Sequence, residues 1–129
     1  MAQSLLFDTD ILIEYLRETD EAVAFLEGRE ENFMLSTITI AELFTGVRTA
    51  MEESTLERFL LGFDAISVSD RIAKRGGLLR HEYSPSHGTG LADALIATTA
   101  LESQTLLVTF NAKHYPMLPS DKILVPYLR

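Results

Sequence analysis

Short apolar segments with the length of buried strands alternate along this chain with segments of helical periodicity. Strands are expected at residues 4–7, 33–35, 65–68 and 105–108, with a short last strand at 123–126. The most apolar of the expected helices runs from Leu91 to about Glu102. Such alternation is typical of a mostly parallel sheet covered by helices on both faces. We therefore expect an α/β fold, a three-layer α/β/α sandwich with a mostly parallel sheet of four to five strands.

Two interruptions are expected in the helical part of the pattern. Gly76-Gly77 is expected to kink or end the helix that begins after Ser69-Asp70. Residues 84–90, Ser-Pro-Ser-His-Gly-Thr-Gly, have the composition of a loop. The chain contains no repeat, no low-complexity tract and no linker long enough to divide it. Residues 1–129 are therefore expected to form a single domain with one core.

Composition narrows the classes of protein to which the chain can belong. It contains no cysteine, which excludes disulfides, thiolate zinc sites and cysteine nucleophiles and fits the cytosol. The longest strongly apolar run, residues 91–101, is too short to span a bilayer and contains Asp93. No basic segment followed by a long apolar one marks a secretion signal at the N-terminus. We expect a cytoplasmic protein that does not contact the membrane.

The net charge of −8 limits how this chain could bind nucleic acid. Proteins that grip nucleic acid over a broad surface are normally basic, because they neutralise many phosphates. If nucleic acid is the substrate, contact must be local, bridged by metal or assisted by a partner. An acidic surface also suits a basic protein partner.

Three acids stand alone in apolar stretches. Asp8 ends Leu-Leu-Phe-Asp, Glu42 lies in Ile-Ala-Glu-Leu-Phe, and Asp93 lies in Leu-Ala-Asp-Ala-Leu-Ile-Ala. No Lys or Arg lies within three positions of any of them. Burying an unpaired charge is unfavourable, and the usual remedies are a partner cation, a raised pKa or a metal ion. A shared divalent cation is a good candidate, and with it metal-dependent phosphate chemistry.

Each acid also has an ordinary structural explanation. Asp8 could simply cap the helix that follows it, although Asp10 is then a second acid at a helix start that needs only one cap. Glu42 could flank the apolar stripe of its helix and reach solvent. Asp93 could be a first-turn acid favoured by the helix dipole. Two acids at a strand end also suit a cation bound through oxygen.

Asn111 follows the expected fourth strand as Asp8 follows the first. It could cap the turn there, or it could donate a neutral oxygen to a metal, with Thr109 supporting it through a hydrogen bond. Ligands of open α/β sheets bind beyond the carboxyl ends of the strands. Asp8 and Asn111 are therefore expected to share one crevice.

The ordered set of motifs resembles the PIN-domain ribonucleases, and most closely the VapC toxins of prokaryotic toxin–antitoxin pairs. The motifs are Leu-Phe-Asp-Thr-Asp-Ile-Leu, Thr-Ile-Thr-Ile-Ala-Glu-Leu-Phe-Thr-Gly, Ala-Asp-Ala-Leu-Ile-Ala and Leu-Leu-Val-Thr-Phe-Asn-Ala-Lys-His-Tyr, and together they cover nearly the whole chain. The resemblance implies an α/β/α fold, Mg²⁺ or Mn²⁺ as cofactor, and endonucleolytic RNA cleavage that leaves a 3′-hydroxyl and a 5′-phosphate. It also implies a homodimer inhibited by an antitoxin from the same operon, with DNA contacted only through that antitoxin.

The resemblance assigns roles to residues of this chain. Asp8, Glu42 and Asp93 match the three acids of the family, and Asn111 matches a fourth position where Asp is also common. Asp10 falls where Asn or Ser is frequent, and it could replace the charge that Asn111 lacks. The expected catalytic residues are thus the first four, and Asp10 joins them as an expected metal ligand. Whether one or two ions are held stays open.

Basic and histidine residues outside these motifs have two interpretations each. Basic residues are concentrated in a strip of five, Arg71, Lys74, Arg75, Arg80 and His81, of which the first three are expected on one helical face. A solvated helix face is the favoured interpretation, and an RNA-backbone or dimer contact is the alternative. His87 is a possible residue of the site rim, and His114 is expected to pack or cap. The histidines form no i, i+4 pair, so a histidine zinc site is not expected.

Two other functions fit part of the sequence. Residues 5–10, Leu-Leu-Phe-Asp-Thr-Asp, resemble the opening motif of haloacid dehalogenase-like phosphatases, with Asp8 as nucleophile and Asp10 as acid/base. Leu12 stands there where Thr or Val is usual, and no later Asp-Asp pair follows. Alternatively the chain could be a non-catalytic PIN-like subunit that binds a partner, a possibility that Asn111 keeps open.

Overall fold

The computed structural model describes residues 3–129, which contain a five-stranded, entirely parallel sheet. Its strands are β1 (Leu5–Phe7), β2 (Phe33–Ser36), β3 (Asp64–Ile66), β4 (Leu106–Val108) and β5 (Ile123–Leu124). Their order is β3-β2-β1-β4-β5, so the first strand in sequence is the central strand in space. The predicted α/β class and mostly parallel sheet are confirmed.

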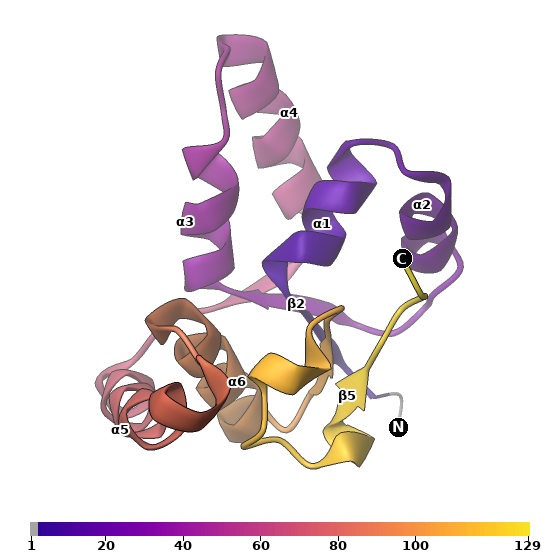
Figure 1. Cartoon of the computed structure of the whole chain (residues 1–129). Coiled ribbons are helices and arrows are strands. Elements are labelled where there is room, and N and C mark those ends of the chain that lie inside the picture. The colour runs from indigo at the N-terminus through magenta and orange to yellow at the C-terminus, as the bar shows by residue number, and fades with distance from the viewer. Residues whose placement is uncertain (1–2) are drawn as a thin grey trace.

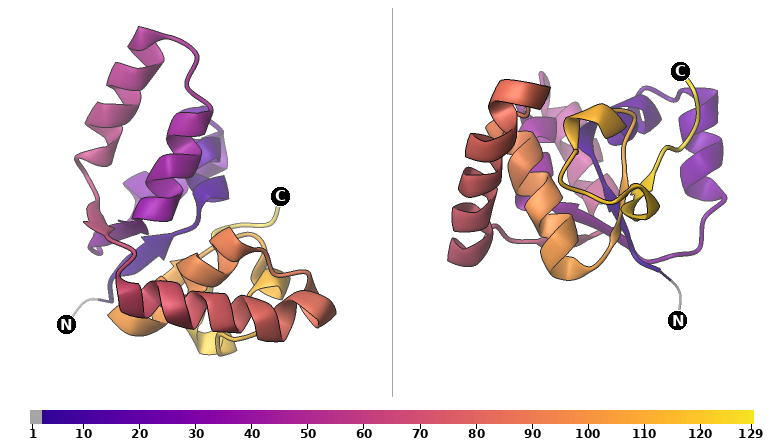
Figure 2. Two further views of the ribbon diagram at one scale, coloured as in Figure 1. Left: turned by 90° about the vertical axis from the view of Figure 1, so that its left-hand side faces the viewer. Right: turned by 60° about the horizontal axis from the view of Figure 1, so that its bottom comes forward.

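Helices cover both faces of this sheet (Figure 1). They are α1 (Thr9–Leu16), α2 (Asp20–Glu27), α3 (Thr37–Thr45), α4 (Ala50–Leu60), α5 (Asp70–His87) and α6 (Leu91–Ser103), with short 3-10 turns η1 (Ala112–His114) and η2 (Ser120–Lys122). The helices α1 to α4 lie on one side of the sheet, and α6 with α5 packed on it lies on the other (Figure 2). This is the three-layer arrangement that the sequence predicts.

The central strand β1 is buried on both faces because its side chains alternate between two cores. Leu5 and Phe7 belong to the core beneath α1 to α4, where the Phe7 ring meets Phe33 edge-on with centroids 4.8 Å apart. Leu6 belongs to the core beneath α6, with Ile96. A strand buried in this way holds the residue that follows it, Asp8, at a fixed place in the middle of the sheet edge.

Side-chain caps start the helices at this edge. The Asp8 carboxylate accepts the Thr9 N–H at the start of α1, and the Ser36 hydroxyl accepts the Ile38 N–H at the start of α3. Each cap satisfies a backbone donor that the helix itself leaves unpaired. The caps turn the chain sharply from strand into helix, so the first turns of α1 and α3 meet above the carboxyl ends of β1 and β2.

The helix α5 is longer than the sequence predicts. It runs without a break through Gly76-Gly77 and includes Pro85, ending at Gly88, whose φ of 65° is left-handed. The loop expected at residues 84–90 therefore shrinks to residues 88–90. Gly76 is needed for close packing, since a Cβ there would lie 2.6 Å from Leu95 Cδ2 of α6. The predicted kink is wrong because the glycine serves a helix–helix contact.

None of the helices within residues 3–129 combines the length and apolar character that a membrane crossing requires.

Candidate active site

Asp8 lies just beyond β1 and is nearly fully buried, with 6% of its surface exposed. One carboxylate oxygen, Oδ1, accepts the Thr9 N–H at 2.8 Å and so caps α1. The other, Oδ2, accepts the hydroxyls of Thr109 at 2.7 Å and Tyr115 at 2.9 Å. The two interpretations of Asp8, helix cap and site residue, therefore hold together, one on each oxygen.

Asp93 is linked to Asp8 by a tyrosine hydroxyl that contacts both carboxylates. It lies in the first turn of α6, half-buried, and its Oδ1 is 3.3 Å from the Tyr115 hydroxyl that also donates to Asp8. Its Oδ2 is 3.6 Å from His114 Nδ1. His114, which the sequence suggests as a packing or capping residue, thus stands beside a predicted site acid.

Glu42 is linked to Asp8 through Thr9. It is exposed on α3, as one interpretation of the sequence proposed, yet its Oε1 accepts the Thr9 hydroxyl at 2.5 Å. The backbone N–H of the same Thr9 donates to Asp8. A single threonine therefore joins two of the predicted acids, Asp8 just beyond β1 and Glu42 on α3.

Asp10 and Asn111 face each other across the sheet edge. The Asn111 side-chain amide donates to Asp10 Oδ2 at 2.9 Å, and the Asn111 backbone N–H donates to Thr109 Oγ1 at 3.0 Å. The Arg129 guanidinium lies 3.6 Å from Asp10 Oδ2 and stacks over the Phe110 ring, 4.2 Å from its centroid. Asp10 is thus held by a neutral amide and approached by one cation.

One hydrogen-bond network includes all five predicted site residues. It runs from Asp93 through Tyr115, Asp8, Thr109 and Asn111 to Asp10, and branches from Asp8 through Thr9 to Glu42. Its members come from segments at both ends and in the middle of the chain, and they meet at the carboxyl edge of the sheet, as parallel topology requires.

Tyr115 and Thr9 are members of the network that sequence reasoning missed. Tyr115 is 1% exposed and follows η1. No pattern in the neighbouring sequence indicates the role of its hydroxyl, because the apolar surrounding that makes a hydrogen-bond partner necessary is formed by distant elements. Thr109, by contrast, was expected beside Asn111 and also bonds Asp8.

Burial dominates the electrostatics of the network. It raises the pKa of the Asp8 carboxyl above its ordinary value, with nearby Asp10 adding to the rise, while the hydrogen bonds from Thr109, Thr9 and Tyr115 oppose it. Burial, together with the charges of Asp8 and Asp93, also raises the pKa of Tyr115, so its phenol remains a protonated donor. In the described part of the chain, the ion pairs leave Asp8 and Glu42 without a cationic partner.

The donor set fits a hard divalent cation in its chemistry. All five predicted ligands offer carboxylate or amide oxygens, which Mg²⁺ and Mn²⁺ prefer. The buried charge of Asp8, which no described cation pairs, is a further reason for one. Across residues 3–129, no three acidic or histidine side chains stand close enough to form a finished ligand set. The acids are thus connected by hydrogen bonds along the carboxyl edge of the sheet. Asp8 and Asp93 both accept from one donor, the Tyr115 hydroxyl.

Other candidates from the sequence lie outside the network. His87 ends α5, exposed, with its Nδ1 2.7 Å from the Ser86 hydroxyl. Arg71 and Arg75 of the basic strip both pair with Glu102 of α6, the latter at 2.5 Å. At least two cations of the strip therefore tie α5 to α6.

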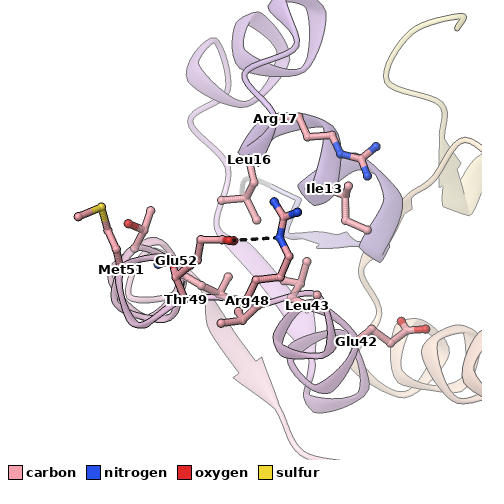
Figure 3. Close-up of a pocket in the computed structure, with 13 residues that line it drawn as sticks. Ile13, Leu16, Arg17, Glu42, Leu43, Arg48, Thr49, Met51 and Glu52 are labelled. Carbon is pink, nitrogen blue, oxygen red and sulfur yellow. Dashed lines mark hydrogen bonds and ion pairs between the residues drawn. The ribbon is translucent and has the colours of Figure 1, made fainter.

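An apolar cleft of about 680 Å³ lies between α1, α3 and α4, beside the network (Figure 3). Ile13, Leu16 and Leu43 line it, and Arg48 pairs with Glu52 at 3.5 Å on its wall. Of the network residues, Glu42 alone contributes to the lining. This cleft is therefore adjacent to the network and shares only Glu42 with it.

Comparison with known proteins agrees with this geometry. The model of the PIN domain family matches residues 5–116, which contain all the network residues. The chain belongs to the PIN domain family. This membership confirms the predicted resemblance. It also favours the PIN interpretation of the Asp8 motif over the phosphatase one, because the match includes that motif.

Relatives of this PIN domain span almost its whole length. It is 36% identical over 121 residues to ribonuclease VapC10 of Mycobacterium tuberculosis, covering 92% of this chain and 90% of that protein. A toxin–antitoxin complex from Klebsiella pneumoniae contains a chain with a TM-score of 0.82 and 32% identity, with 97% and 99% of the two chains covered. VapBC2 of Rickettsia felis, bound to a promoter DNA fragment, gives a TM-score of 0.73 at 26% identity, with 90% and 93% covered.

Proposed function

We propose that this PIN domain is a metal-dependent endoribonuclease and the toxin of a type II toxin–antitoxin pair. The observation that carries the proposal is the network around Asp8, which unites the three family acids at one edge of the sheet. The chain is 36% identical to a protein named ribonuclease VapC10, which supports RNA as the substrate.

The network suggests how the residues divide the work. Asp8 and Asp93, with Glu42, Asn111 and Asp10 around them, would hold Mg²⁺ or Mn²⁺. When bound, such an ion acidifies a water molecule and neutralises charge on the phosphate. Thr109 and Thr9 orient the carboxylates through the hydrogen bonds described above, so that fewer side-chain rotations are lost on binding. Hydrolysis would leave a 3′-hydroxyl and a 5′-phosphate.

The proposed partners follow from the relatives and from charge. Solved relatives are toxin–antitoxin complexes, one of them bound to promoter DNA, which supports a cognate antitoxin and DNA contact through it. The net charge of −8 agrees with DNA contact made by the partner. We further propose a homodimer acting in the cytoplasm. Light scattering tests the dimer: a mass of one chain would contradict it.

Cleavage of structured RNA by the purified protein with Mn²⁺ tests the proposed function. Asp8→Asn keeps the size of the side chain but removes its charge, so cleavage is expected to fall about 100-fold or more. Asp64→Asn is the matched control, because Asp64 is exposed at the start of β3 and outside the network. Equal cleavage by all three proteins would reveal a contaminating nuclease. No cleavage by the unaltered protein at any Mn²⁺ concentration would favour the non-catalytic alternative.

A further inference from the structure

The Tyr115 hydroxyl is held in place by the core beneath α6. Its ring is 1% exposed and packs in the cluster that contains Leu6, Ile96 and Leu107. A side chain packed in this way has little freedom to move its polar end. The hydroxyl is therefore a fixed point in the fold, set by residues of β1, α6 and β4.

This fixed hydroxyl lies between two like charges. It is 2.9 Å from Asp8 Oδ2 and 3.3 Å from Asp93 Oδ1, and it carries a single proton. The proton attracts both carboxylates, which would otherwise repel each other. Asp8 comes from the end of β1 and Asp93 from the start of α6, so the hydroxyl couples two elements of the site.

The hydrogen bonds of Asp8 leave room for a cation beside this contact. A carboxylate has about four lone-pair positions, two on each oxygen. Tyr115 and Thr109 occupy Oδ2, whereas Oδ1 accepts only the Thr9 N–H. A cation on Oδ1 would not displace the phenol.

We propose that Tyr115 is a positioning residue, whose hydroxyl keeps Asp8 and Asp93 at the spacing from which both can ligate one divalent cation. This inference rests on the proposed metal-dependent function and adds to it a residue that no comparison assigns. Removing the hydroxyl as Tyr115→Phe leaves the ring packing intact. Asp93 is then repelled by Asp8 and can turn toward solvent and His114, since its side chain is 32% exposed and its Oδ2 lies 3.6 Å from His114 Nδ1.

Mn²⁺ binding, measured by electron paramagnetic resonance without RNA, tests the proposal directly. Tyr115→Phe is expected to weaken binding about 10-fold, as loss of a residue that orients a metal ligand commonly does. Tyr15→Phe is the matched control, because the Tyr15 hydroxyl also donates to a carboxylate, that of Glu27, at 3.1 Å but outside the network. Equal affinity in Tyr115→Phe and the unaltered protein would overturn the proposal.

The dependence of cleavage on Mn²⁺ concentration distinguishes positioning from a general structural role. If Tyr115 positions the ligands, the curve for Tyr115→Phe shifts to higher Mn²⁺ and reaches the same plateau. A lower plateau with an unshifted midpoint would overturn the proposal. If the unaltered protein neither binds Mn²⁺ nor cleaves RNA, the proposed function itself fails.

A spectroscopic measurement on the unaltered chain avoids the question of whether Tyr115→Phe folds. The chain has four tyrosines, and labelling their ring Cζ with ¹³C gives four resonances. Tyr→Phe changes at positions 15, 83 and 127 assign the fourth by elimination. Mg²⁺ is expected to shift the Tyr115 resonance, because a bound cation draws electron density from Asp8 and Asp93 and so weakens the hydrogen bonds that they accept from its hydroxyl. An unmoved resonance at saturating Mg²⁺ would overturn the proposal.

Discussion

The Asn111 side-chain amide donates a 2.9 Å hydrogen bond to Asp10, an acid 101 positions earlier in the chain. The bond gives a physical reason why an asparagine suits this position, where the family resemblance would also allow aspartate. A neutral donor there stabilises the charge of Asp10, whereas a second carboxylate would repel it. The bond therefore pairs the neutral side chain of residue 111 with the acid at residue 10, which we propose as the replacement for the charge that Asn111 lacks.

Asn111→Asp is expected to make the protein more dependent on metal. Two carboxylates would then face each other with Arg129 alone close by, so the metal-free protein should lose about 1–2 kcal/mol of stability. Mn²⁺ neutralises the pair, so the metal-induced rise in Tm should exceed that of the unaltered protein. Thermal denaturation with EDTA and with Mn²⁺ measures both. An equal metal-induced rise in the two proteins would contradict the prediction.

Asp8→Asn is expected to raise the Tm of the metal-free protein at neutral pH. Burial raises the pKa of Asp8 in the folded state above its ordinary value of 3.8, so folding disfavours the charged form. Below pH 3.8 the Asp8 carboxyl is protonated in both the folded and the unfolded state, and folding carries no penalty for its charge. The free energy of unfolding then falls as the pH rises through the raised pKa of the folded state. The stability gained by the variant should therefore grow with pH across that window and then level off. Denaturation in EDTA from pH 3 to pH 8 tests the sign, and a constant difference would refute it.

Adjacent glycines of α5 are expected to respond differently to alanine. Gly77→Ala should stabilise the protein by about 0.5–1 kcal/mol, because nothing lies within 4 Å of the new Cβ and alanine favours the helix. At Gly76 the Cβ would meet Leu95 Cδ2 at 2.6 Å and its Cα at 3.4 Å, so Gly76→Ala should be about 1–3 kcal/mol less stable than Gly77→Ala. Urea denaturation measures both. Similar midpoints would show that α5 and α6 separate easily.

Arg75→Glu is expected to leave RNA cleavage unchanged. Arg75 and Arg71 both pair with Glu102, so the substitution places two acids together and should cost about 0.5–1 kcal/mol, less at high salt. Cleavage per folded molecule and the oligomeric state are the measurements. A 10-fold loss of cleavage without a loss of fold would instead support the RNA-contact interpretation of the strip.

The sequence predicted the layered fold from local signals, and it predicted the grouping of the acids from sheet topology together with the family resemblance. Short apolar runs predicted the strands, and parallel topology then placed the residues after β1 and β4 at one edge. Asp8 and Asn111 could therefore be expected together although neither signal is specific alone.

What sequence reasoning missed depends on contacts between distant elements. Gly76-Gly77 and Pro85 favour a break by local preference, but α5 packs along α6 and continues through them. The role of Tyr115 could not be predicted either, because its hydroxyl contacts two acids only after β1 and α6 have folded next to it. No local pattern contains that information.

The central place of β1 has a consequence for translation. In a nascent chain that ends before β4, the strand β1 has β2 as its one neighbour. Asp8 then lacks the hydrogen bonds from Thr109 and Tyr115, which follow β4 in the sequence. Contacts so remote along the chain form late. The acids can therefore assemble only after almost the entire polypeptide has left the ribosome, and a product that ends before β4 would lack Thr109, Asn111 and Tyr115.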